Sequence, residues 1–323
     1  MPLYPLKFVP ILKERIWGGS QLKTKLFKEN ASQGIGESWE LSAVEGSVSF
    51  VANGAFKGTS LTELIGEFKS QFLGSEVARD FGLNFPVLIK FLDAADDLSI
   101  QVHPNDMLAK KRHNSLGKNE MWYVMEAEPN ASLIVGFKPG TTSEMYQKHL
   151  NEGTLVTLME KHFISPGDAF YIETGTVHAI GAGTLIAEIQ QTSDITYRVY
   201  DFNRKDAQGN YRELHTDLAF DAINFSAPTP KKCGYSTQEN ERNTLLNTPY
   251  FKTKYLPIKG NYIEEGRTGE SFSAFLCVNG SGEISNPFGS TDFKYGETIL
   301  VAANSPSLSI NSPKGCVLLE VHY

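Results

Sequence analysis

The sequence predicts a mainly β protein built from two β-barrels, with a few α-helices in its N-terminal half. Short apolar segments separated by glycine and proline turns run through residues 163–200 and again through residues 272–321. The two regions also resemble each other. Residues 165–172 align with residues 294–301, each with a glycine at its third position followed by an acidic residue and an apolar run. The weak internal repeat therefore predicts a duplicated barrel.

Helical patterns are confined to the region between residues 60 and 162. Ser60 and Glu63 have the spacing of a capping box, and the apolar residues that follow recur at helical intervals up to Phe68. Asn105 is a suitable N-cap for another helix. The helices expected after the first are residues 75–81, residues 105–111, and residues 143–162 with an interruption at Gly153.

Extended segments account for most of the remaining pattern. Residues 203–213 are polar and are expected to form a surface loop, and a connector of about 228–248, rich in Pro, Thr, Asn and Lys, suggests a domain boundary. We therefore expect domains at residues 1–235 and 236–323. The predicted strands are residues 37–42, 86–103 with a break at Asp96-Asp97, 120–125, 132–136, 272–278, 282–284, 298–302, 308–310 and 316–321.

Composition is typical of a globular protein and excludes several classes of partner. The 323 residues are 41% hydrophobic and 21% charged, with a formal net charge of −7. This charge argues against a nucleic-acid surface, and an anionic substrate would need a local cluster of cations. We expect a cytoplasmic protein without a secretion signal or a membrane span, because no basic leader and no apolar run of about 18 residues is present. Three widely spaced cysteines fit a reducing compartment.

Four polar residues form a candidate metal site. Gln101 and His103 are two apart in a strand-like run, so both side chains should point to one face. Glu120 begins a later strand, and His178 lies in a glycine-flanked segment. Two imidazoles, a carboxylate and an amide oxygen suffice for a divalent metal and leave room for a substrate. The internal repeat places Ser307 where His178 stands, so the second barrel is expected to lack the metal site.

The motifs around these residues resemble a known family. Residues 166–178, a Pro-Gly-Asp turn, a strand and Gly-x-x-His, resemble the second motif of the cupin superfamily. The short spacing from Glu120 to His178 resembles the short bacterial form of type I mannose-6-phosphate isomerase. Closer resemblance to that isomerase family lies in residues 98–106, 117–120, 175–179 and 193–198, with Trp17-Gly18-Gly19 near the start.

The resemblance implies a fold, a reaction and a cofactor. The fold would be two cupin-like, jelly-roll barrels, the second degenerate. The reaction would be aldose–ketose isomerisation of mannose 6-phosphate and fructose 6-phosphate through a cis-enediol. Zinc, one ion per chain, would be bound by Gln101, His103, Glu120 and His178, although these donors also suit iron, manganese or cobalt.

The resemblance also assigns catalytic and substrate-binding roles. Arg198 would stabilise the developing enediolate, because a guanidinium stays charged and offers two donors. The general base is left open among three residues: Lys118, Glu188 and Asp194. The substrate-binding candidates are Ser99, Lys90, Arg204 and Trp17. Lys90 stands in an otherwise apolar strand, where a lysine is costly unless it is paired.

Three alternative functions remain open at this point. The same metal donors could serve a cupin that acts on another sugar phosphate, or a redox cupin such as an iron dioxygenase. A non-catalytic sugar-binding protein on the same fold is the third. The expected partner is a small sugar phosphate, with no nucleic acid and no membrane, and we expect a monomer or a weak homo-oligomer.

Overall fold

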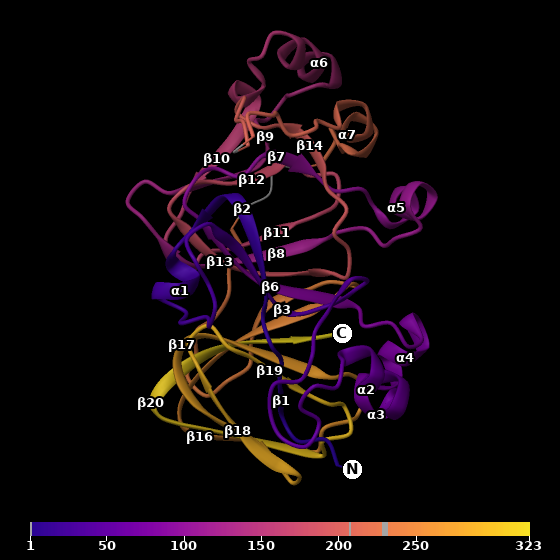
Figure 1. The fold of residues 1–323 in the computed structure, drawn as a ribbon, viewed down its shortest axis with the longest axis vertical. Coiled ribbons are helices and arrows are strands. Elements are labelled where there is room, and N and C mark those ends of the chain that lie inside the picture. Colours follow the sequence, from indigo (N-terminus) through magenta and orange to yellow (C-terminus); the bar gives the residue numbers. More distant parts are fainter. Residues whose placement is uncertain (1, 207, 228–231) are drawn as a thin grey trace.

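Two β-barrels stacked along the long axis form the molecule (Figure 1). The computed structural model describes residues 2–206, 208–227 and 232–323. The upper barrel in Figure 1 carries the candidate metal residues, and the lower barrel is built mainly from the C-terminal strands. None of the described helices has the length and apolar character needed to span a bilayer.

The helices lie mostly on the flanks of the barrels (Figure 1). The longest of them begin at side-chain caps: the Ser60 hydroxyl accepts from the backbone N–H of Glu63, and the Asn105 side chain accepts from that of Leu108. The described helices are α1 Gln21–Thr24, α2 Leu61–Phe68, α3 Ser70–Leu73, α4 Ser75–Phe81, α5 Asp106–His113, α6 Ser143–Asn151, the 3-10 helix η1 Leu155–Leu158 and α7 Thr216–Ala222.

The strands divide between the two barrels in chain order, with two exceptions in the N-terminal part. The strands at residues 43–44 and 47–48 form a two-stranded sheet of their own. The first strand, at residues 6–7, pairs with the C-terminal sheet rather than with the upper barrel. The described strands are β1 Leu6–Lys7, β2 Ile11–Gly19, β3 Ile35–Leu41, β4 Ala43–Val44, β5 Ser47–Val48, β6 Val87–Ala94, β7 Ile100–Val102, β8 Glu120–Ala127, β9 Ser132–Phe137, β10 Met159–Phe163, β11 Ala169–Ile172, β12 His178–Ile180, β13 Thr184–Gln191, β14 Tyr197–Tyr200, β15 Asn243–Asn247, β16 Lys252–Glu265, β17 Ser273–Asn286, β18 Gly289–Lys294, β19 Thr298–Val301 and β20 Ser307–His322.

Antiparallel pairing produces the two sheets of the upper barrel. Within the described residues, one sheet has the order β11-β8-β13-β6-β2-β3 and the other β10-β9-β12-β7-β14. Buried apolar side chains such as Trp122, Phe170 and Ile186 fill the space between them. The lower barrel is a single curved sheet in the order β1-β19-β17-β20-β16-β15, with β18 added at β17. A larger apolar cluster that includes Leu6, Phe91 and Phe272 joins the barrels.

Most predicted elements are confirmed. The mainly β class and the helices at residues 60–68, 75–81 and 105–111 agree with α2, α4 and α5. The helical prediction for residues 143–162 is wrong at its end, because residues 159–163 form β10 and pair with β9. The chain leaves the helical conformation at Gly153, whose φ of 69° favours glycine.

The connector prediction is correct only in part. Residues 243–247 form β15, and residues 228–231 lie outside the described part of the chain. The domain division at residue 235 stays a prediction.

The alignment of Ser307 with His178 is wrong by three residues. His178 is flanked in its sheet by Gln101 and Val135, and the residue with the same surroundings in the lower barrel is Ile310, between Tyr262 and Ile284. Ile310 lies nine residues after Val301, whereas His178 lies six residues after Ile172, and a gapless alignment cannot register these three extra residues. The expected consequence still holds, because Ile310 also cannot bind a metal.

Candidate active site

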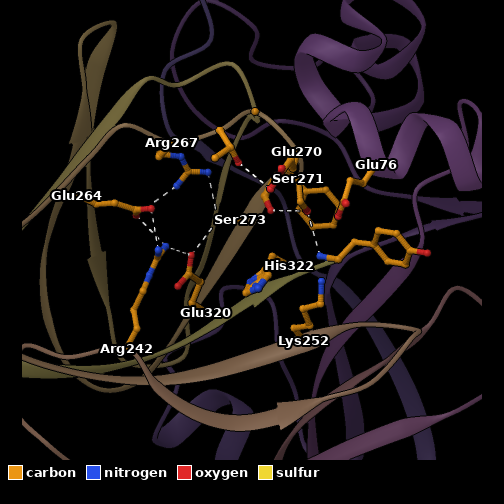
Figure 2. Close-up of a pocket in the computed structure, with 14 residues that line it drawn as sticks. Glu76, Arg242, Lys252, Glu264, Arg267, Glu270, Ser271, Ser273, Glu320 and His322 are labelled. Carbon is orange, nitrogen blue, oxygen red and sulfur yellow. Dashed lines mark hydrogen bonds and ion pairs between the residues drawn. The ribbon is translucent and has the colours of Figure 1, made fainter.

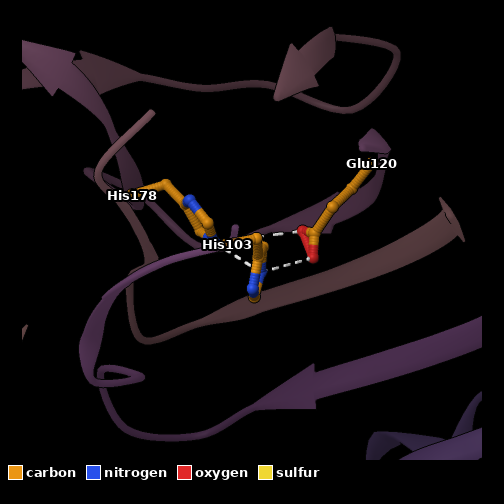
Figure 3. Close-up of side chains that lie close together, drawn as sticks. All are labelled: His103, Glu120 and His178. Atoms are coloured by element: carbon orange, nitrogen blue, oxygen red, sulfur yellow. Dashed lines mark hydrogen bonds and ion pairs between the residues drawn. The ribbon is translucent and has the colours of Figure 1, made fainter. Parts of the chain in front are cut away.

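The candidate metal residues come from three strands of the upper barrel: β7 and β12, which are neighbours in one sheet, and β8 in the other sheet. His103 follows β7, Glu120 opens β8 and His178 opens β12 (Figure 3). His178 lies directly opposite Gln101 in the antiparallel β7–β12 pair. Gly175, in the turn before β12, donates its N–H to the carbonyl of His103 at 2.9 Å. A side chain at Gly175 would meet the Ala222 carbonyl at 3.0 Å, so the tight turn requires glycine.

The three strongest donors converge on one buried point. The Nε2 atoms of His103 and His178 lie 3.1 Å apart, and His103 Nε2 lies 3.0 Å from Glu120 Oε1. His178 Nε2 lies 3.9 Å from Glu120 Oε2. The three residues are buried, and their ligand atoms all lie within 4.8 Å of one another. The Gln101 amide nitrogen lies 3.3 Å from His178 Nε2, so a 180° turn of that amide brings its oxygen to the same point.

The hydrogen bonds around the imidazoles show that this set fits a metal. Each Nδ1 faces a backbone carbonyl, His103 that of Ile195 at 2.9 Å and His178 that of Thr176 at 2.8 Å. Because a carbonyl only accepts, each Nδ1 carries the proton and each Nε2 presents a lone pair. Two lone pairs and a carboxylate facing one another call for a cation. In the described structure Glu120 Oε2 is also buried without a hydrogen-bond partner.

Burial keeps the imidazoles in the neutral form that binds metals. Burial and the nearby Lys118 ammonium lower the pKa of His103 to about 3, and burial lowers the pKa of His178. Burial opposes the charge on Glu120, but Lys118 and His103 hold the pKa of Glu120 well below its usual range. The site therefore consists of two neutral nitrogen donors and one anionic oxygen.

Lys118 is part of the same cluster. Its ammonium donates to Glu120 Oε1 at 2.9 Å and lies 3.2 Å from His103 Nε2. Burial disfavours this charge, but Glu120 and Glu188 outweigh it and raise the pKa of Lys118. The predicted position of Lys118, on the face of the metal ligand two residues later, is confirmed by these contacts.

A cavity of about 510 Å³ opens beside the cluster. Of the residues predicted for catalysis or substrate binding, Arg204 is the one that does not line it; its guanidinium contacts Asp96, Asp201 and the carbonyl of Asp97. The residues of that prediction that do line the cavity are Trp17, Lys90, Ser99, Lys118, Glu188, Asp194 and Arg198, and Gln101 lines it as well.

Lys90 and Glu188 form a buried ion pair in the wall of the cavity. They face each other across the β6–β13 pair, with Lys90 Nζ 2.9 Å from Glu188 Oε1 and 2.6 Å from Gln190 Oε1. The indole N–H of Trp122 donates to the other oxygen of Glu188 at 3.0 Å. Burial and the charge of Glu120 raise the pKa of Glu188. The expectation that a lysine in this apolar strand must be paired is confirmed.

Ser99 and Asp194 line the cavity with polar side chains that no protein group holds in the described structure. Ser99 is buried and Asp194 is exposed, and in the described part of the chain neither side chain makes a hydrogen bond or ion pair to protein. Both groups are therefore available to a substrate. Trp17 is buried in the barrel core and also lines the cavity, so it serves both of the purposes considered for it.

An arginine cluster lies at one side of the cavity. Arg198, in β14, donates to the carbonyl of Glu213 at 2.7 Å, and its buried Nε has no hydrogen-bond partner among the described residues. Burial and the charge of Arg212 lower the pKa of Arg198. Arg212 and Arg204 share one carboxylate, that of Asp201, whereas Arg198 has none within ion-pair distance in the described structure. Arg198 therefore brings to this side of the cavity a positive charge with which no carboxylate pairs directly in the described structure.

Sequence reasoning missed several residues of the cavity. Arg212 lies in the segment predicted as a surface loop, which folds back through the Lys205–Tyr211 bridge. Arg15 and Glu37 form an ion pair at 2.8 Å between β2 and β3. Burial opposes the charge of Glu37, but Lys90 and Arg15 hold its pKa at about 2. No local motif marks these residues, because pairing between distant segments brings them to the cavity.

Comparisons with known proteins agree with this arrangement. A sequence profile for the catalytic domain of type I phosphomannose isomerase matches residues 6–139. The chain is 35% identical to mannose-6-phosphate isomerase ManA of Bacillus subtilis over 98% of this chain and 99% of the relative. It is 38% identical to mannose-6-phosphate isomerase of Streptococcus mutans over 80% of each chain.

A solved structure gives the same result for the fold. The crystal structure of mannose 6-phosphate isomerase from Bacillus subtilis superposes with a TM-score of 0.89 at 33% identity, covering 99% of this chain and all of that one. The likeness extends through both barrels and includes the strands that bear His103, Glu120 and His178. This chain belongs to the mannose-6-phosphate isomerase family.

Proposed function

We propose that the chain is a metal-dependent aldose–ketose isomerase that interconverts mannose 6-phosphate and fructose 6-phosphate. Family membership supports this reaction over the oxygenase and non-catalytic alternatives. The structural observation that carries it is the cluster of His103, Glu120 and His178 beside a cavity lined by Arg198 and Arg212. A cytoplasmic location and a monomeric or weakly associated state stay predictions.

The proposed metal ligands are Gln101, His103, Glu120 and His178. Their combined charge is −1, so a bound dication keeps net positive charge and polarises the sugar oxygens as a Lewis acid. Zinc suits two imidazoles and a carboxylate, and we propose it as the native ion. Iron, manganese and cobalt are the competitors, because the donor set does not discriminate strongly among them.

The arginine cluster suits the charged parts of the substrate. We assign Arg198 to the enediolate oxygens, because its guanidinium lines the cavity and its Nε has no protein partner among the described residues. We assign the phosphate to Arg212 together with the free hydroxyl of Ser99. Arg204, a candidate from sequence, would act on the phosphate indirectly, by holding Asp201 and through it Arg212.

Isomerisation moves one proton from C2 to C1. A base takes the C2 proton of mannose 6-phosphate, and the electron pair forms the enediolate. A proton is then delivered to C1 and the O2 hydroxyl proton passes to O1, which gives fructose 6-phosphate. Three side chains of the cavity are suited to this transfer. Lys118 is an ammonium and therefore a donor, Glu188 is a carboxylate already held by Lys90 and Trp122, and Asp194 is a carboxylate without a protein partner in the described structure.

A side-by-side coupled assay tests the proposed reaction. Mannose 6-phosphate and glucose 6-phosphate are supplied separately to the metal-loaded protein, and fructose 6-phosphate formation is followed. We expect efficient turnover of mannose 6-phosphate and at least about a hundredfold lower kcat/KM for glucose 6-phosphate, a difference of about 2.7 kcal/mol in transition-state binding. Equal turnover of both sugars would reject the substrate assignment, and turnover of neither would reject the reaction.

A further inference from the structure

The lower barrel repeats the strand pairing of the catalytic barrel residue by residue. In the upper barrel Glu120 of β8 lies opposite Ile172 of β11. In the lower barrel Ser273 of β17 lies opposite Val301 of β19, and the internal sequence repeat aligns Val301 with Ile172. Ser273 therefore occupies the place of the metal ligand Glu120.

Two further positions follow from the same comparison. Glu188 lies between Lys90 and Trp122, and Glu320 lies between Lys254 and Phe275, so Glu320 occupies the place of Glu188. Ile310 occupies the place of His178 and pairs with Tyr262, so Tyr262 occupies the place of Gln101. His103 lies two residues after Gln101, and Glu264 lies two residues after Tyr262. Glu264 therefore occupies the place of His103.

A cavity lies at this second set of positions. It has a volume of about 190 Å³ and is lined by Glu264, Ser273 and Glu320 (Figure 2). Its other charged lining residues come from β16, β20, the loop after β16, helix α4 and the residue that precedes β15. They are Arg242, Lys252, Arg267, His322 and, at the rim, Glu76 and Glu270.

The two inner carboxylates are already bound by arginine. Arg242 makes two bonds to Glu264, at 2.7 and 2.8 Å, and a third to Glu320. Ser273 donates to the same oxygen of Glu320 at 2.9 Å. With isoleucine and serine at two of the equivalent ligand positions and arginine on the carboxylates, this cavity is not suited to a metal.

Three groups beside this network retain unused donors. The side chain of Arg267 is only 6% exposed; it donates to Ser273 at 3.2 Å and lies 3.6 Å from Glu264, but its Nε and Nη1 have no hydrogen-bond partner. In the described part of the chain, the side chains of Lys252 and His322 make no hydrogen bond or ion pair. An unpaired buried donor is costly, and an acceptor in the cavity would relieve that cost.

The electrostatic field in the cavity is positive around His322. Burial, followed by the charges of Arg242, Lys252, Lys254 and Arg267, lowers the pKa of His322 to about 4. The same cations that disfavour a proton on this imidazole favour an anion beside it. The rim carboxylates Glu76 and Glu270 oppose a large polyanion, which leaves a small ligand with one oxyanion group as the best match.

We propose that the mouth of the lower barrel is a second small-molecule site, which binds a small metabolite through a phosphate or carboxylate group placed between Lys252, Arg267 and His322. This site has the location of the catalytic cavity in the duplicated barrel, but its ligand is held by cations alone. Arg242 keeps the carboxylates of Glu264 and Glu320 from repelling the anion.

The histidine resonances of the full-length, metal-loaded protein provide a local test. Inorganic phosphate and, separately, acetate are titrated at constant pH and ionic strength, and the His322 signal is identified by its loss in His322→Gln. We expect a saturable shift of the His322 signal with at least one of the two anions. In Lys252→Ala the apparent Kd should rise by about tenfold, which corresponds to 1.4 kcal/mol. Phosphate binding in the catalytic cavity is read separately, from His103 and His178.

Lys254→Ala is the matched control. Lys254 lies two residues from Lys252 on β16 and carries the same charge, but its ammonium donates to Thr244 and it does not line the cavity. Lys254 contributes to the field at His322 but does not line the cavity, so this control should raise the Kd by less than about threefold, against about tenfold for Lys252→Ala. The proposal is overturned if His322 responds to neither anion, or if both lysine variants weaken binding equally. Isomerase turnover is a separate readout, so failure here leaves the catalytic assignment intact.

Discussion

Glu188 in the catalytic barrel and Glu320 in the C-terminal barrel occupy equivalent strand positions, and each is buried against a cation. Glu188 is bound by Lys90 from the opposite strand, and the pair lines a cavity that also reaches Lys118. Glu320 is bound instead by Arg242, which directly precedes β15 and reaches across to Glu264 as well. Equivalent backbone positions thus place one glutamate in the wall of an open cavity and the other in a network of ion pairs.

The difference between the barrels lies in few residues. Ile310 stands where the catalytic barrel has His178, and Ser273 stands where it has Glu120. The second barrel therefore lacks these candidate metal donors, although its strand pairing is kept. The barrel framework depends on alternating apolar side chains and antiparallel register, which both halves keep. Function in this protein is therefore carried by side chains that the fold accepts but does not require.

Metal removal should have the largest effect, and only on the catalytic barrel. Chelation should lower kcat by at least about a thousandfold, because the polarised sugar oxygens lose their Lewis acid. Adding back zinc, manganese, cobalt or iron one at a time, with elemental analysis, should restore activity and identify the native ion. Full-rate isomerisation by metal-free protein would contradict the assignment of His103, Glu120 and His178.

Arg198→Ala should have the next largest effect. Loss of a charged donor aimed at the enediolate should lower kcat by about 10² to 10³-fold while metal content stays unchanged. Steady-state kinetics and elemental analysis of the same preparation separate the two effects. Arg112, which pairs with the exposed Asp221 outside the cavity, offers a control: Arg112→Ala should leave kcat unchanged within about twofold. If the Arg198→Ala protein lost its metal, the role of Arg198 would be to maintain the structure of the metal site.

Much of the fold could be predicted from sequence because its signals are local. A capping box at Ser60, an N-cap at Asn105 and glycine turns in the β-rich segments each determine a nearby element. The errors arose where the structure of a segment depends on which strand it pairs with. Residues 159–163 have an ambiguous pattern and become β10 because β9 presents a free edge. Three extra residues at the start of β20, before Ile310, shifted the repeat, since a strand can lengthen at its end without changing its register.

The candidate site could be predicted to the extent that its residues lie in short motifs. His103 follows directly on β7, which holds Gln101, and Lys118 lies two residues before Glu120, so the proximity within each pair followed from spacing. Arg212 and Glu37 could not be found this way, because each reaches the cavity through contacts with distant segments. The contact of Arg204 with Asp201 likewise depends on how the loop folds back.

Exchanging a carboxylate for an amide at the two equivalent positions tests the comparison directly. Glu188→Gln should lower kcat by about tenfold or more, because a charged group in the cavity wall is lost beside the reacting atoms. Glu320→Gln should leave kcat within about twofold but reduce the free energy of unfolding by about 2 kcal/mol, because Arg242 loses one of its charged acceptors. Kinetics and denaturant unfolding on both variants measure the contrast. A similar loss of kcat in both would show that the barrels are functionally coupled.

Arg212→Ala should have the smallest effect on catalysis and a selective effect on binding. The phosphate does not react, so removing its cation should raise KM by about tenfold and change kcat by less than about threefold. Asp201 keeps Arg204 as a partner in this variant, so the loop should stay folded, which thermal unfolding would check.

Arg204→Ala distinguishes the two arginines that share Asp201. Arg204 does not line the cavity, so its removal should act through the position of Asp201 and raise KM less than Arg212→Ala does. Inorganic phosphate provides a second readout, because its inhibition constant against mannose 6-phosphate should rise in Arg212→Ala in parallel with KM. If Arg204→Ala raised both constants more than Arg212→Ala, the phosphate would belong to Arg204, and the loop would have to rearrange to bring that guanidinium into the cavity.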